Sequence, residues 1–392
     1  MSERKLELQI PWWKTSLGEQ EAHAAASSIA KENITMGPTV SRLEQSIAET
    51  LDVPHAVATP SGSASLTLAL MGIGVGPGDE VIVPNRTFIG TANAALLLGA
   101  RVVLAPVRED VPLLDVDSLA SRITPRTKAI IVVHLNGASA DMHRLNDMAK
   151  QHGVHLVEDA CQAMFSRNRA GYLGTQSRVG CYSLGVTKLI SSGFGGIAVT
   201  RDTRLYHRMI RMRNQGLDGS LGDDYRHAGF NFKCSDILAA IGLVQLSKKE
   251  EKIRHVNAIY ERYRQAVREL PFMEMMPVNV ARGELPLYAV ALCSRRTQLM
   301  KFLQFEGIQT RRLPPDLNTA TYLYADTCWP TTRYSRDGLI LPCGPDQPIQ
   351  YVERVIDALH RFDQVRRWRR DSAVAPRIPQ VVPHRDAVGV ET

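Results

Sequence analysis

The chain has 392 residues, of which 44% are hydrophobic, 22% charged and 6% aromatic, and its formal net charge is +7 at pH 7. This composition is typical of a soluble globular protein and excludes the collagen-like, disordered and coiled-coil classes. The length predicts one large domain and a second, smaller one. A charge of this size on so long a chain is compatible with an anionic small-molecule substrate but does not indicate one.

No part of the sequence indicates secretion or membrane insertion. The N-terminal segment lacks the apolar core of a secretory signal, and no window approaches the roughly 18 to 20 apolar residues of a membrane span. The six cysteines are far apart and form no C-x-x-C pair. We therefore expect no metal site, no disulfide framework, no membrane partner and a cytoplasmic location.

Short apolar runs alternate with helix-like segments between about residues 55 and 200. Runs of this length rich in Val and Ile predict buried strands of a mostly parallel sheet. The runs occupy residues 55–59, 80–84, 101–105, 129–133, 154–158, 180–184 and 196–200. The segments between them have helical spacing of apolar residues, so the sequence predicts an α/β fold with helices on both faces of the sheet.

The pattern changes near residue 235. Residues 235–270 are compatible with one long helix that starts apolar and becomes charged, as helices that connect two domains often do. Shorter elements beyond it predict a smaller α+β domain. The expected division is a large domain at 1–235 with an N-terminal arm at 1–20, a small domain at 236–365 and an extended tail at 366–392.

The tail begins with the string RRWRR at 366–370. Basic residues around an aromatic occur in nucleic-acid-binding patches. A solvated helix end is the simpler interpretation, and the residues that follow contain Pro and no apolar period, which indicates loose packing. We therefore expect no nucleic-acid partner.

Four segments carry residues suited to chemistry, of which the last, 229–233 just before the long helix, offers polar side chains but only a weak signal. The turn at 60–66 joins a strand to a helix through small residues, so that free N–H groups at the helix start could bind an anion, although any such turn looks similar. Asp159 follows a strand at the edge where α/β sheets bind ligands, and its alternative role is a helix cap. Lys188 is the only charged residue in 180–200, which favours a partly desolvated amine nucleophile over a surface lysine.

Six collinear strings resemble the DegT/DnrJ/EryC1/StrS family of sugar aminotransferases, which are fold type I pyridoxal-phosphate (PLP) enzymes. The resemblance runs from about Pro11 to Arg361 and is strongest up to residue 246. The strings are MGPTVSRLEQSIAETLDVPHAVATPSGSASLTLAL, GVGPGDEVIVPNRTFIGTANAALLLGA, ITPRTKAIIVVHLNGASADM, HGVHLVEDACQA, YSLGVTKLISSGFGGIAVT and GFNFKCSDILAAIGLVQL.

The resemblance assigns the catalytic residues. Lys188 matches the lysine that forms the Schiff base with PLP and then moves the proton, and Asp159 matches the carboxylate paired with the pyridine nitrogen. Gln162 matches the residue near the 3-hydroxyl group of the cofactor. In the relatives that deoxygenate sugars with a pyridoxamine cofactor, His stands at the lysine position. The resemblance therefore favours the aminotransferase branch for a chain with Lys188.

The resemblance also implies further cofactor contacts. Phe88 matches the aromatic residue that stacks on the ring. Gly62, Ser63 and Ser183 match the phosphate-binding groups. Asn231 matches an asparagine that reaches the phosphate in the neighbouring subunit, which implies a homodimer with shared active sites.

The sequence departs from the family pattern at four places. Ser63 stands where Thr is usual, Asn136 where an aromatic is usual and Phe194 where an acidic residue is usual. The His-Tyr-Pro-like stretch near the acceptor is replaced by 309–319, where Arg311 and Arg312 could contact an anionic acceptor such as a nucleotide diphosphate.

The resemblance implies transfer of an amino group from L-glutamate to a keto-sugar, most often a nucleotide-linked one. An aminotransferase for a keto-cyclitol or another ketone is the nearest alternative. A non-catalytic PLP-binding regulator would not need Lys188, Asp159 and Gln162. An NAD-linked oxidoreductase is disfavoured because the glycines of 72–78 lack the dinucleotide-binding spacing.

Overall fold

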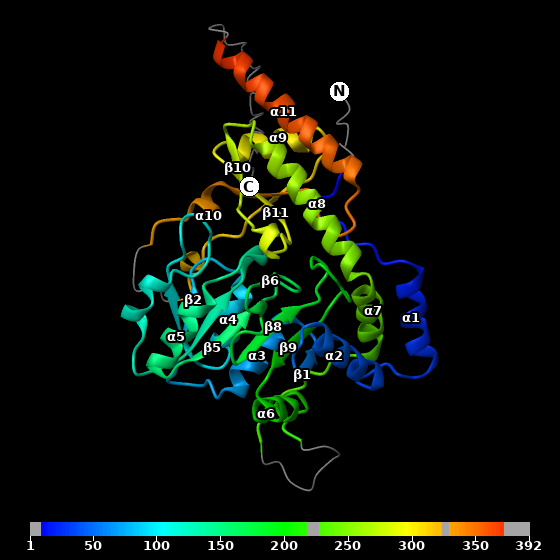
Figure 1. Cartoon of the computed structure of the whole chain (residues 1–392), viewed down its shortest axis with the longest axis vertical. Helices are drawn as coiled ribbons and strands as arrows, with labels where there is room; N and C mark the ends of the chain where they lie inside the picture. Colours follow the sequence, from blue (N-terminus) through cyan, green and yellow to red (C-terminus); the bar gives the residue numbers. More distant parts are fainter. Residues whose placement is uncertain (1–8, 218–226, 324–328, 372–392) are drawn as a thin grey trace, which may run out of the picture.

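A computed structural model of the chain describes residues 9–217, 227–323 and 329–371, and Figure 1 shows their arrangement. Its largest element is a seven-stranded sheet with the order β1-β9-β8-β5-β4-β2-β3. The strands are β1 (His55–Thr59), β2 (Glu80–Pro84), β3 (Arg101–Ala105), β4 (Thr127–Val133), β5 (His155–Asp159), β8 (Val179–Ser183) and β9 (Gly196–Thr200). Each lies within two residues of a predicted run.

The sheet is mostly parallel, as predicted, and β9 alone among its strands is antiparallel to both neighbours. Parallel neighbours need a crossover, usually a helix, whereas antiparallel ones can be joined by a loop. The loop at 184–195 makes that direct connection between β8 and β9, and it carries Lys188 to the carboxyl edge of the sheet.

Helices cover both faces of the sheet, as predicted. On β4, Ile131 and Val133 pack with α3 (Gly62–Gly72) and α4 (Ile89–Leu96), whereas the alternate residues Ile130 and Val132 pack with α5 (Met142–His152). The remaining helices beside this sheet are α1 (Glu19–Ala30), α2 (Pro38–Thr50), α6 (Thr203–Arg213) and α7 (Asp236–Ser247).

The predicted long helix at 235–270 is two helices, because the chain bends at Lys248 between α7 and α8 (Lys249–Val267). The apolar α7 packs against α1 and α2 beside the large sheet, whereas the amphipathic α8 packs against the small sheet and α11. Lys248 donates to Glu21 at 2.6 Å, which holds the bend against α1. The prediction of one helix was wrong because the two halves have different packing partners.

A second, antiparallel sheet lies beyond α8 with the order β10-β11-β13-β12. Its strands are β10 (Met273–Met275), β11 (Ala289–Cys293), β12 (Arg311–Arg312) and β13 (Gly338–Leu341). The helices of this part are α9 (Arg296–Phe305), α10 (Arg333–Asp337) and α11 (Ile349–Asp371), and a small hairpin in the large part pairs β6 (Arg167–Asn168) with β7 (Gly171–Tyr172).

The extended tail that the sequence predicts from residue 366 is corrected at its start, because α11 continues to Asp371 through residues that are good helix formers. The rest of the tail, 372–392, lies outside the described residues. Within the described part of the chain, no helix is long and apolar enough to cross a membrane. The domain boundaries at 235 and 365 stay predictions.

Candidate active site

A cavity of about 350 Å³ opens at the carboxyl ends of β2, β4, β5 and β8 and is closed on one side by the small sheet. Ligands of α/β sheets bind at this edge. Nine of the residues singled out from the sequence line it, namely Gly62, Ser63, Phe88, Asn136, Asp159, Gln162, Ser183, Lys188 and Arg311. They come from distant parts of the chain, so the fold assembles the site.

The start of α3 lies on the wall of the cavity. Ser61 caps the helix by accepting from the N–H of Ala64 at 3.1 Å, and Gly62 and Ser63 of the first turn line the cavity, where N–H groups of a helix start can bind an anion. A Cβ on Gly62 would lie 2.7 Å from Cys161 Sγ and 2.9 Å from Ser183 Cβ. Glycine is therefore required for the helix start to approach the end of β8, where Ser183 adds a hydroxyl.

Asp159 ends β5 and is 5% exposed. Its Oδ2 accepts from Thr91 Oγ1 on α4 at 2.7 Å, and its Oδ1 accepts from the N–H of Cys161 at 3.1 Å. Thr91 also contacts Thr87 through their hydroxyl groups at 3.0 Å. These donors fix the orientation of a carboxylate that faces the cavity and could receive one further N–H group.

Lys188 is half-buried on the loop between β8 and β9, where its backbone N–H donates to Gly185 at 3.1 Å. Its side-chain amine has no hydrogen bond or ion pair with any described residue. Burial and the nearby Asp159 carboxylate raise the pKa of the Cys161 thiol well above its ordinary value, and the charge of Lys188 opposes this rise. The amine and the carboxylate therefore act on the same thiol, which stays protonated.

Gln162 and Asn136 form the connection from the cavity to the small sheet. Gln162 Oε1 accepts from the N–H of Asn136 at 3.0 Å. Asn136 has φ 54°, a left-handed conformation that Asn tolerates better than an aromatic residue. Its side-chain amide pairs with the backbone of Tyr288, accepting at 2.6 Å and donating at 3.0 Å. The departure from an aromatic residue at position 136 thus has a structural reason.

Two aromatic residues that the sequence did not indicate, Trp12 and Tyr288, also line the cavity. The guanidinium of Arg311 lies over the ring of Trp12 at 4.7 Å, and Tyr288 packs against Trp12 with ring centroids 6.4 Å apart. Arg86, which is 4% exposed, pairs with Asp316 and Pro314 and so ties the end of β2 to the small domain.

Three residues named from the sequence do not line this cavity. Arg312 points away from Arg311, as alternate strand residues do, and lines a separate hollow beside α9. Phe194 is 70% exposed at the surface. Asn231 is exposed and pairs with Asn214 through its backbone, so its contact with a neighbouring subunit stays a prediction.

Thr91 is the missed residue that the sequence could have indicated. It lies three residues after Phe88, in the first turn of α4, so one helix start presents both side chains to the cavity. Trp12 and Tyr288 had no such signal, because their positions depend on the pairing of the N-terminal arm with the small domain, in which Ile10 lies beside Ile308.

The arrangement combines in one cavity a helix start suited to an anion, a fixed carboxylate, an exposed aromatic ring and an amine that has no partner among the described residues. Such a set can bind a phosphorylated planar heterocycle, keep its ring nitrogen protonated and attack its carbonyl group. A simple hydrolase would need none of the ring-facing groups.

Comparisons with solved structures agree with this chemistry. DesV of S. venezuelae, solved in complex with a ketimine intermediate, is 31% identical with a TM-score of 0.83, over 87% of this chain and 94% of DesV. The aminotransferase TlmJ from Streptoalloteichus hindustanus is 28% identical with a TM-score of 0.86, over 91% and 99%. 3-Amino-5-hydroxybenzoic acid (AHBA) synthase is 25% identical with a TM-score of 0.82, over 91% and 100%.

The sequence itself matches the profile of one family over residues 15–360, which is most of the chain and includes every residue of the cavity except Trp12. The family match and the geometry of the cavity both indicate transfer of an amino group. The chain belongs to the DegT/DnrJ/EryC1/StrS aminotransferase family and is an aminotransferase.

Proposed function

We propose that the chain is a PLP-dependent aminotransferase that moves an amino group from an amino acid, expected to be L-glutamate, onto a nucleotide-linked keto-sugar. The observation that carries the proposal is that the amine of Lys188, which has no partner among the described residues, shares one cavity with the Asp159 carboxylate and the start of α3. When bound, PLP supplies the aldehyde that takes up the amino group and the ring that withdraws electrons from the reacting carbon.

The residues of the cavity fit this cofactor. The N–H groups at Gly62 and Ser63, with the hydroxyl of Ser183, would bind the phosphate. Phe88, which is 56% exposed in this chain, would cover one face of the ring. The carboxylate of Asp159 would hold a proton on the ring nitrogen.

Lys188 would then act on the substrate side. Its amine is within the cavity and without a competing partner among the described residues, so it can attack a carbonyl and afterwards carry a proton between the C4′ atom and the substrate carbon. Gln162, held by Asn136, would orient the 3-hydroxyl group.

The acceptor is proposed from the relatives and from the wall of the cavity. PseC of Helicobacter pylori, which shares this fold at 20% identity, is named for the biosynthesis of pseudoaminic acid. A sugar could pack on Trp12 and Tyr288 while Arg311 binds an anionic group. AHBA synthase is named for an aromatic product, so a cyclic ketone other than a sugar is the second candidate.

A direct test is to add PLP to the purified chain, record the visible absorption band, and then add glutamate with a panel of nucleotide-linked keto-sugars, inososes and other cyclic ketones. We expect glutamate to remove the band and one acceptor class to restore it with formation of an amine, detected by mass spectrometry. Absence of a band, or no transfer to any ketone, would contradict the proposal.

Arg311→Ala should weaken binding of an anionic acceptor. A lost hydrogen bond to a charged group costs about 1.5–3 kcal/mol, so KM for the acceptor should rise roughly 10- to 150-fold while KM for glutamate stays unchanged. Arg312→Ala is the matched control, because it removes the same charge from the next residue of β12, which lines the other hollow. Equal effects of both variants would show that only the general charge of this strand matters.

A further inference from the structure

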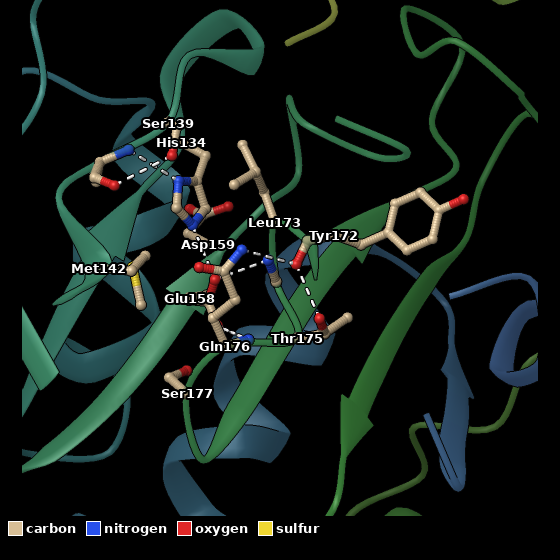
Figure 2. Close-up of polar contacts among 12 residues, drawn as sticks. His134, Ser139, Met142, Glu158, Asp159, Tyr172, Leu173, Thr175, Gln176 and Ser177 are labelled. Carbon is tan, nitrogen blue, oxygen red and sulfur yellow. Dashed lines mark hydrogen bonds and ion pairs between the residues drawn. The ribbon is translucent and has the colours of Figure 1, made fainter. Parts of the chain in front are cut away.

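A second buried carboxylate lies directly behind the active site. Glu158 precedes Asp159 on β5, so its side chain points to the opposite face of the sheet, where α5 packs, and it does not line the cavity. It is 0% exposed. Figure 2 shows Glu158 between His134 and the loop at 173–177.

Three donors converge on this carboxylate. Glu158 Oε2 accepts from His134 Nε2 at 2.9 Å and from the N–H of Gly174 at 2.7 Å, and Oε1 accepts from the N–H of Gln176 at 2.8 Å. Burial raises the pKa of Glu158, but the hydrogen bonds from His134 and Gly174, together with Ser177, outweigh burial and leave this pKa below its ordinary value. The group is therefore a carboxylate whose lone pairs are used by fixed donors.

The proton of His134 is placed by its other neighbour. Ala140 donates its N–H to His134 Nδ1 at 3.3 Å, so Nδ1 is the acceptor and the ring proton is on Nε2, directed at Glu158. Reversing the ring would set two N–H groups against each other at Ala140. The His134–Glu158 pair therefore has only one arrangement in which both ring nitrogens of His134 have a suitable hydrogen-bond partner.

The same pair is joined to the cavity through the backbone. The N–H of His134 donates to the carbonyl of Asp159 at 3.1 Å, which continues the pairing of β4 with β5 by one step. The turn that follows His134 carries Asn136, whose N–H holds Gln162. Movement of His134 would thus displace both Asp159 and Gln162.

We propose that Glu158 and His134 are a positioning pair that sets the places of Asp159 and Gln162 against the cofactor. This inference rests on the proposed function, because it concerns how the cavity holds PLP. It assigns a role to a buried polar cluster that touches neither the cofactor nor the substrate.

Glu158→Gln is the sharpest test, because the amide keeps the shape of the side chain. Gln has a single acceptor oxygen, so its NH₂ group must face either Gln176 or the donors His134 and Gly174, and no arrangement satisfies all three. We expect the dissociation constant of PLP to rise about tenfold, which equals ~1.4 kcal/mol, and kcat to fall up to about 100-fold, the loss expected when a reacting group is misplaced by about 1 Å.

The chain offers a matched control on the same face of the same sheet. Glu80 is 2% exposed at the first residue of β2, where it accepts from Thr124 at 2.6 Å and from Arg126 at 2.9 Å, at the edge opposite the cavity. Glu80→Gln should lower the melting temperature of the cofactor-free chain, as Glu158→Gln does, but leave the dissociation constant of PLP and its absorption spectrum unchanged.

His134→Gln carries the test if Glu158→Gln does not fold, since it keeps an N–H donor for Glu158 and should show a smaller loss of PLP affinity than His134→Leu. Hydrogen exchange at 134–138 in the cofactor-free chain should increase in each Glu158 or His134 variant that folds. The inference would be overturned if variants at both Glu158 and His134 kept an unchanged PLP affinity and absorption spectrum, or if Glu80→Gln lost as much PLP affinity as Glu158→Gln. If the wild-type chain gives no visible band with PLP, the proposed function itself fails, before any variant is compared.

Discussion

Lys188→Ala is expected to abolish the visible absorption band that PLP gives with the chain and to lower kcat at least about 10³-fold. The variant removes both the nucleophilic amine and the group that carries the proton, and general acid–base catalysis alone contributes about 10²–10⁴-fold. Since the amine has no partner among the described residues, the free energy of unfolding should change by less than about 1 kcal/mol. Absorption spectra, single-turnover kinetics and thermal melting of the cofactor-free chain measure the three quantities.

The same variant tests whether two chains share each active site. Mixed dimers of Lys188→Ala chains with Asn231→Ala chains contain one site with both an intact lysine and an intact neighbouring asparagine. Each variant alone should have low activity. Mixing the two should therefore restore activity, up to one functional site per mixed dimer. The exposed apolar residues Phe194 and Phe230 support such a contact. No recovery on mixing would favour a site built within one chain.

The seven strands of the large sheet were predictable because most of their residues are buried, on both faces of the sheet. β2 and β9 are buried at all five positions, so their sequences are continuous apolar runs that need no partner to be recognised. Asp159 follows from the same signal, since it comes directly after the predicted strand at 154–158 and ligands bind at the carboxyl edge, whereas Ser183 was assigned by the family resemblance.

The other features of the fold and the site depend on contacts between distant parts of the chain, which no local sequence pattern indicates. The bend at Lys248 arises because α7 and α8 pack against different sheets. Arg311 and Arg312 are identical side chains, and only the pairing of β12 with β13 decides which one faces the cavity. The amide of Asn136 meets the backbone of Tyr288, 152 residues away in sequence.

Asp159→Asn is the second variant with a large expected effect, because it separates the charge of the carboxylate from its shape. The amide oxygen can still accept from the N–H of Cys161, and the NH₂ group can donate to Thr91 if the Thr91 hydroxyl turns toward Thr87. The hydrogen bonds and the fold should therefore persist while the negative charge beside the ring nitrogen is lost. Removing a preorganised electrostatic contact of this kind costs about 10²–10³-fold in kcat.

Thr91→Val provides the complementary change, since it removes the hydrogen bond at 2.7 Å but leaves the charge of Asp159 in place. A hydrogen bond to a charged group contributes about 1.5–3 kcal/mol, but the N–H of Cys161 still orients the carboxylate, so we expect a loss of roughly tenfold in kcat, smaller than that of Asp159→Asn. Steady-state kinetics and PLP titration of the two variants then give a direct comparison. If Thr91→Val is as damaging as Asp159→Asn, orientation of the carboxylate dominates; if Asp159→Asn is harmless, the carboxylate does not serve the ring nitrogen. The expected order follows from the structure, in which Cys161 continues to orient the carboxylate when Thr91 is removed, whereas no other described carboxylate lines the cavity to replace its charge.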